Sequence, residues 1–295
     1  MKRLLTTIFL FSAIIITAPA VTPADTDSIE NLSTAQLVQR TQKAKRHKDY
    51  LTAMVHASEL LSRNQNNSYA KNFVHDNWGM MMQQVDEIIS QNTDMEDVEQ
   101  CANRTRAYSL LADVERRINT VSMPLRGNGW QWQPEMLYTA GEYQSERMHL
   151  SRLVRAEASK ALQGHDAEAL EECYRLLLAS DLLFPEERQS NRQLLLADCN
   201  AKIEELTSGL DEVKDDESDE LDEDSVRRLK HRLNDLLFAD ELMPLSLMLE
   251  PNQPTIEEKQ IKVKTEVSRL YLQLSTYYLQ QGDTLQAQTY RSAAE

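Results

Sequence analysis

Two tryptophans, a tyrosine, three cysteines and an acidic run are the residues whose types and spacing could support binding or chemistry. Trp130 and Trp132 lie in a stretch, 122–134, whose two prolines and two glycines make it too irregular for a helix interior. In extended backbone, side chains two residues apart point to the same side, so the indoles predict one platform for a sugar ring or a peptide side chain. Tyr138 is a third candidate binding residue. The alternative is that the indoles fill a gap between helix pairs.

The cysteines offer a disulfide rather than a metal site. Cys101, Cys173 and Cys199 are accompanied by no CxxC or HxxxH spacing. Pro185 disfavours helical geometry in the residue before it, which predicts a turn close to residue 186, midway between Cys173 and Cys199. The two thiols then lie at the same height of a helical hairpin, which predicts a Cys173–Cys199 disulfide. Two buried, reduced side chains are the alternative.

Motifs for catalysis are absent from the sequence. It has no GxSxG, HExxH, GxGxxG or phosphate-binding glycine-rich loop, so we expect no enzyme, no cofactor and no metal site. The acidic run 211–224 lacks the glycine that an EF-hand loop requires. Its charge density predicts a disordered linker, and weak divalent-cation binding is the alternative reading.

Composition limits the class of protein further. The 295 residues carry a formal net charge of −15 and no basic patch, which argues against nucleic acid as a partner. At 41% hydrophobic and 27% charged residues, the chain is typical of a folded soluble protein. Its 7 glycines leave little material for the turns of a sheet protein, so we expect an all-α fold.

The first residues have the pattern of an export signal. Lys2 and Arg3 precede an apolar stretch, 4–16, and Ala18 and Ala20 are the small residues that a signal peptidase reads. We expect a signal peptide over 1–20, a flexible segment over 21–33, and a protein that is periplasmic or secreted. No later segment approaches the ~20 apolar residues of a membrane span, so stable membrane insertion is not expected.

Apolar residues recur three and four positions apart through most of the chain, which predicts a string of helices. We expect helical repeats over 34–210, the acidic linker over 211–224, and C-terminal helices over 225–295. The predicted helices are 33–48, 50–64, 68–91, 94–120, 134–163, 166–182, 186–208, 224–240, 256–281 and 284–294.

The clearest internal pattern is a helix pair whose facing positions alternate large and small residues. Its members are Tyr271, Leu274, Ser275 and Tyr278, then Gly282 and Asp283 at the turn, then Ala287, Tyr290 and Ala294. These positions resemble the tetratricopeptide repeat (TPR), which has a period of ~34 residues. Weaker copies cover 34–67 and 153–176. The resemblance implies antiparallel helix pairs stacked as an α-solenoid.

A second resemblance covers 108–191. It rests on Arg116-Arg117-Ile118-Asn119 at a helix end, a proline-bearing crossover, Tyr138 and Tyr143, and Leu182-Leu183-Phe184-Pro185 after an alanine-rich helix. This stretch is similar to an uncharacterised group of exported TPR-like proteins from Bacteroidota. The resemblance implies a fold and a compartment but no activity.

Repeat proteins of paired helices generally hold a partner on a concave surface. We therefore expect an exported adaptor that binds a protein or peptide partner in the cell envelope. Two alternatives are a glycan-capture module that uses Trp130 and Trp132, and an envelope enzyme without a recognisable motif.

Overall fold

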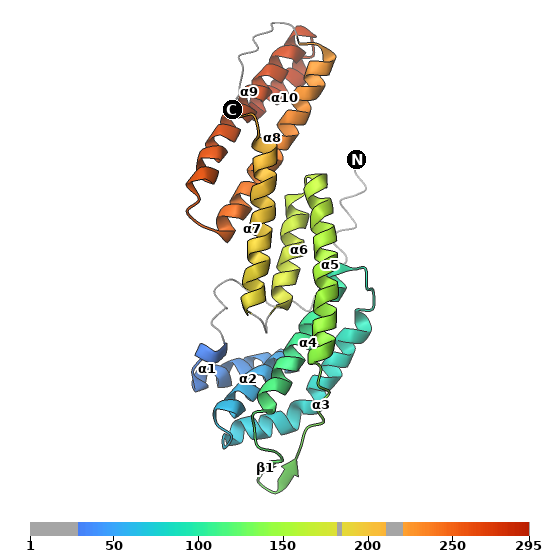
Figure 1. Ribbon diagram of the computed structural model, residues 1–295, viewed down its shortest axis with the longest axis vertical. Helices are drawn as coiled ribbons and strands as arrows, with labels where there is room; N and C mark the ends of the chain where they lie inside the picture. The colour runs from blue at the N-terminus through green and yellow to red at the C-terminus, as the bar shows by residue number, and fades with distance from the viewer. Residues whose placement is uncertain (1–28, 182–184, 211–220, 295) are drawn as a thin grey trace. The chain divides into compact units, whose positions relative to one another are not determined.

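The computed structural model describes residues 29–181, 185–210 and 221–294, and these fold into ten α-helices and one small hairpin (Figure 1). The elements are η2 (Ile29–Asn31), α1 (Thr34–Arg46), α2 (Tyr50–Arg63), α3 (Ser68–Gln91), α4 (Val98–Ile118), β1 (Leu125–Gly127), β2 (Trp130–Trp132), α5 (Ala140–Gly164), α6 (Ala167–Ser180), α7 (Pro185–Thr207), α8 (Glu223–Leu249), α9 (Pro254–Gln280) and α10 (Thr284–Ala294). Consecutive helices pack together from α1 to α3 and from α6 to α10, so the all-α class is confirmed apart from the hairpin.

Three predicted segments fall wholly or partly outside the described residues. They are the signal peptide 1–20, most of the segment 21–33, and residues 211–220 of the acidic linker. The predicted linker is too long at its C-terminal end. Asp222 caps α8 by accepting a hydrogen bond from the Ser225 amide, and Glu223 and Asp224 form the first turn of that helix. Acidic residues at this position favour the helix because its N-terminus carries partial positive charge.

Two helix boundaries differ from the prediction by more than four residues. Helix α8 continues through Pro244 to Leu249 instead of ending at 240. An internal proline costs about 3 kcal/mol, but Leu242, Met243 and Leu245 on either side of it are buried, and their burial offsets that cost. Helix α5 begins at Ala140 instead of 134.

The chain divides into two compact units, and the boundaries between them fall at 93/94, 102/103 and 145/146. Unit 1 comprises the described residues of 29–93 and 103–145. Helix α2 is its central element and packs against both α1 and α3. Ala53 and Ala57 are completely buried on α2, and such small side chains allow close helix contacts.

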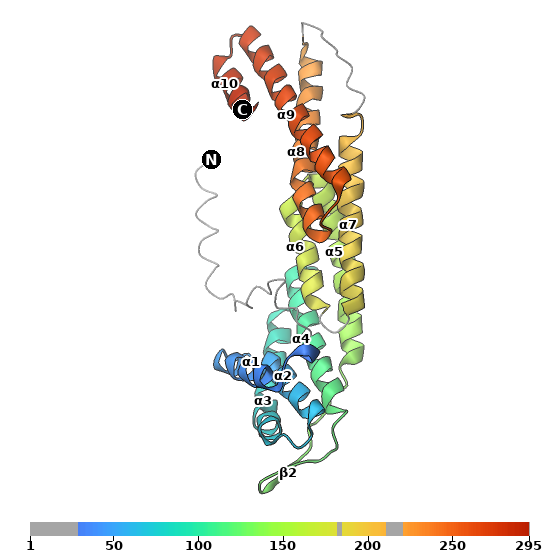
Figure 2. The same ribbon diagram turned by 90° about the vertical axis from the view of Figure 1, so that its left-hand side faces the viewer.

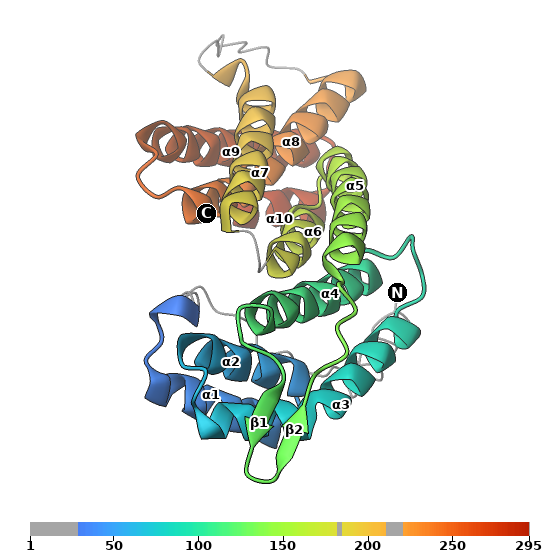
Figure 3. The ribbon, with the colours of Figure 1, turned by 60° about the horizontal axis from the view of Figure 1, so that its bottom comes forward.

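The hairpin of unit 1 lies beside α3 (Figure 3). Its strands are antiparallel, with Leu125 opposite Trp132 and Gly127 opposite Trp130. Leu125 is only 2% exposed and belongs to the apolar core of the unit. This buried leucine fixes the hairpin to the helices.

Unit 2 comprises the described residues of 94–102 and 146–294. In it α7 packs on α8, and α9 packs against both α8 and α10 (Figure 2). The Ser275 hydroxyl donates a hydrogen bond of 2.8 Å to the Ala287 carbonyl, and both residues are buried. The predicted close contact of small residues in the last helix pair is therefore confirmed.

Candidate functional site

Trp130 and Trp132 both face α3. The Trp130 indole stacks on the His75 imidazole with ring centroids 4.3 Å apart, and Trp132 meets the rings of His75 and Trp78 edge-on at 5.5 and 5.8 Å. The space that the platform hypothesis assigns to a sugar ring therefore contains an imidazole of the same chain.

A glycine makes room for this arrangement. Gly127 is the cross-strand partner of Trp130, and a Cβ atom there would overlap the indole ring. The indole thus lies against both His75 and Gly127, and both tryptophans are half-buried. This geometry favours the alternative in which the indoles fill a gap in the packing.

Tyr138 does not join the tryptophans. It precedes α5 in a loop, its side chain is 70% exposed, and it makes no ring contact with the described residues. Its φ of 55° lies in the left-handed region, which is unusual for a bulky residue. The structure therefore separates the three candidate binding residues into a packed pair and one exposed side chain.

A buried carboxylate holds the Tyr138 loop. Glu115 of α4 is 4% exposed and accepts hydrogen bonds from the amides of Leu137, Tyr138 and Thr139, at 2.6, 2.9 and 2.8 Å. It also accepts one from the Thr139 hydroxyl at 2.9 Å. These bonds explain why 134–139 is not helical. The sequence does not predict this role, because nothing distinguishes Glu115 from any other glutamate on a predicted helix.

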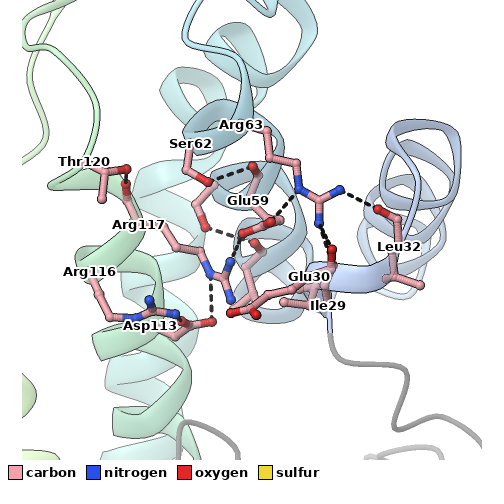
Figure 4. A network of polar contacts seen from close by, with 12 residues as sticks. Ile29, Glu30, Leu32, Glu59, Ser62, Arg63, Asp113, Arg116, Arg117 and Thr120 are labelled. Carbon is pink, nitrogen blue, oxygen red and sulfur yellow. Dashed lines mark hydrogen bonds and ion pairs between the residues drawn. The ribbon is translucent and has the colours of Figure 1, made fainter.

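Unit 1 also contains a buried network of ion pairs (Figure 4). Arg117 bonds Glu59 and Asp113, and Arg63 bonds Glu59 at 2.6 Å. Burial raises the pKa of Asp113 and lowers the pKa of Arg117. Arg63 also donates to the Ile29 carbonyl at 2.9 Å. These charges bond one another or the backbone, as expected of groups that position helices.

The three cysteines are free thiols, so the predicted Cys173–Cys199 disulfide is not formed. Cys199 lies in the large core of unit 2, whereas Cys173 packs against a different, smaller cluster that contains Cys101. The two side chains face different cores because helix rotation, which residue spacing does not fix, turns them apart. Burial raises the pKa of Cys199 to about 12.

A groove of about 610 Å³ in unit 2 is the strongest candidate site. Two segments form it: the turn between α5 and α6 together with the start of α6, and the C-terminal part of α8. Its lining residues are Gly164, His165, Asp166, Ala167, Glu168, Glu171, Glu241, Pro244, Leu245 and Met248.

The wall made by the turn is fixed to α8. The His165 ring stacks on Phe238 of α8, with centroids 4.6 Å apart and 12° between the planes. Asp166 caps α6 by accepting a hydrogen bond of 2.9 Å from the Ala169 amide. The groove is therefore held between packed elements.

The groove combines negative charge with exposed apolar surface. Four carboxylates line it, and no lysine or arginine does. Glu168 and Glu241 have no ion-pair partner within the described parts of the chain. Met248 is 59% exposed, and Leu245 is buried at the wall. The α6 N-terminus contributes a partial positive charge of about half a unit, which is too small to reverse the sign of the groove.

Sequence reasoning missed this groove because it ended α8 at 240. The signal is visible once the helix continues, since Glu241, Pro244 and Met248 follow the i, i+3, i+7 spacing of one helix face.

Comparisons of the chain with protein-family models, curated proteins and solved structures found no match. In residues 29–181, 185–210 and 221–294, no helix has both the length and the hydropathy that a membrane span needs. The same ranges hold no group of three or more His, Cys, Asp or Glu side chains arranged to bind a metal ion.

Proposed function

We propose that this protein is an exported adaptor, built of TPR-like helix pairs stacked as an α-solenoid, that binds a protein or peptide partner in the cell envelope. The groove between the α5–α6 turn and α8 is the binding site. Export and the periplasmic or secreted location rest on the pattern of the first twenty residues.

The observation that carries the proposal is that the groove combines three features. The groove is large enough for several side chains of a partner, and its walls are fixed by the His165–Phe238 stack. It exposes Met248 beside Glu168 and Glu241, which have no ion-pair partner among the described residues. Exposed apolar surface bordered by polar groups is typical of protein interaction sites. Binding, rather than catalysis, is the role that this arrangement supports.

A photo-crosslinking amino acid at position 248 tests the site in cells. We expect a discrete crosslinked species that contains one partner protein, identified by mass spectrometry. The control is the same substitution at position 285, because Leu285 is 76% exposed on α10 and does not line the groove. Equal crosslinking at both positions, or none at 248, would contradict the proposed site.

A further inference from the structure

We propose that the groove binds a basic amphipathic segment of the partner, with lysine or arginine on one side and apolar side chains on the other. This inference rests on the proposed function and adds the chemical class of the ligand.

The negative charge of the groove favours a ligand with positive charge. Asp166, Glu168, Glu171 and Glu241 line it from two separate elements, α8 and the α6 end of the turn. A ligand without charge would cover these carboxylates without supplying hydrogen-bond donors to them, and an acidic ligand would be repelled. Cationic side chains are attracted to the carboxylates and supply those donors.

The spacing of the carboxylates excludes a simple cation. In the described residues, acidic and histidine side chains do not converge into a metal-binding group. Glu168 and Glu171 lie along α6, whereas Glu241 projects from α8. Charges spread over two elements match several cationic side chains of one segment better than one small ion.

The apolar part of the groove explains why the ligand is amphipathic. Pro244 and Met248 are exposed one helical turn apart on α8, with buried Leu245 beside them. Methionine side chains are flexible and polarizable, so they adapt to partners of different shape. A segment that carried only charge would leave this surface in water.

Three synthetic peptides test the inference with the full mature chain. The first has arginines on one helical face and leucines on the other. The second replaces each arginine by glutamate, and the third replaces each by glutamine. We expect calorimetry to detect binding of the arginine peptide only. If the other two peptides also bind, we expect the arginine peptide to bind at least tenfold more tightly. Binding should weaken at higher ionic strength, because added salt shortens the distance over which exposed charges attract one another, which is ~8 Å at 0.15 M.

Variants locate the binding in the groove. Glu168→Gln combined with Glu241→Gln should weaken binding of the arginine peptide by roughly 2- to 30-fold, at about 0.2–1 kcal/mol for each charge pair. Glu257→Gln combined with Glu258→Gln is the matched control, since it changes net charge equally at exposed sites of α9 outside the groove. Met248→Ala should weaken binding without altering its dependence on salt.

The outcomes separate this inference from the proposed function. If the three peptides bind alike, if none binds, or if the Glu257 and Glu258 control loses as much affinity as the groove variant, the basic ligand class is wrong. The adaptor proposal then stands or falls on crosslinking at position 248, which does not depend on the charge of the partner.

Discussion

The Trp130 indole lies over the His75 imidazole, with 4.3 Å between ring centroids and 15° between ring planes. This stack joins the β1–β2 hairpin to α3. Because Gly127 lies against the same indole, the position of Trp130 depends on the lack of a side chain at its cross-strand neighbour. The hairpin is therefore held by ring packing as well as by the buried Leu125.

Gly127→Ala should displace the Trp130 ring. We expect a changed tryptophan fluorescence spectrum and a loss of about 1–3 kcal/mol in the free energy of unfolding, the usual cost of overpacking. Helical circular dichroism should be nearly unchanged. Gly141→Ala is the control, because no atom lies within 4 Å of a Cβ at that position. Identical spectra for the two variants would refute the proposed contact.

Glu115→Ala should release the loop that carries Tyr138. The substitution removes the acceptor of three backbone amides and one hydroxyl. We expect a loss of roughly 2 kcal/mol or more in the free energy of unfolding, because donors in a partly buried loop lose their partner. Limited proteolysis should then cut near residue 138.

Glu135→Ala provides the comparison for the Glu115 variant. Glu135 is exposed in the same loop and should contribute within about 0.5 kcal/mol. If the Glu115 variant were as stable and as resistant to protease as the Glu135 variant, the carboxylate would not hold the loop.

Gly79→Ala should stabilise the protein. Gly79 is exposed within α3, and a Cβ there meets no atom within 4 Å. Alanine is favoured over glycine in a helix by about 1 kcal/mol. Chemical denaturation should show a gain of up to that size. Gly282→Ala should show the opposite sign, because its φ of 80° is strained for residues with a side chain.

The thiols should react in the order of their exposure. Cys173 is half-buried, whereas Cys101 and Cys199 are completely buried. Alkylation of the folded, non-reduced protein should therefore modify Cys173 first, and denaturation should make all three reactive. A peptide pair that links Cys173 to Cys199 in the mass spectrum would show that the bond forms after all.

The spacing of apolar residues was enough to predict the helices, but it does not predict contacts between residues that are far apart in the sequence. The small residues Ser275 and Ala287 predicted a close helix pair because their spacing is local to one hairpin. The strands of Gly127 and Trp130 are too short to show a period. The role of Glu115 depends on a loop 22 or more residues away. The groove was not predicted because α8 was expected to end at 240, before Pro244. The burial of the side chains around Pro244 outweighs the tendency of proline to interrupt a helix.

His56 on α2 makes the stability of the protein depend on pH. Burial lowers its pKa from 6.5 to about 4, with Arg40 as the next cause, and its Nδ1 atom is buried without a hydrogen-bond partner among the described residues. Arg40 of α1 and Arg117 of α4 disfavour the charged ring, whereas Asp49 favours it. The folded protein therefore holds a neutral imidazole.

The unfolded chain binds a proton at His56 near pH 6.5, and the folded chain does so only near pH 4. The contribution of His56 to the free energy of unfolding is thus fully present above pH 6.5. It is lost as the pH falls towards 4, by roughly 3 kcal/mol in total. His56→Phe should remove this loss, measured as the difference in unfolding free energy between variant and parent across that range. Asp113 has a raised pKa in the folded protein, so its contribution to stability increases as the pH falls. This contribution is the same in the parent and in the variant, so it cancels when the two are compared. Parallel profiles for the parent and His56→Phe would contradict the assignment.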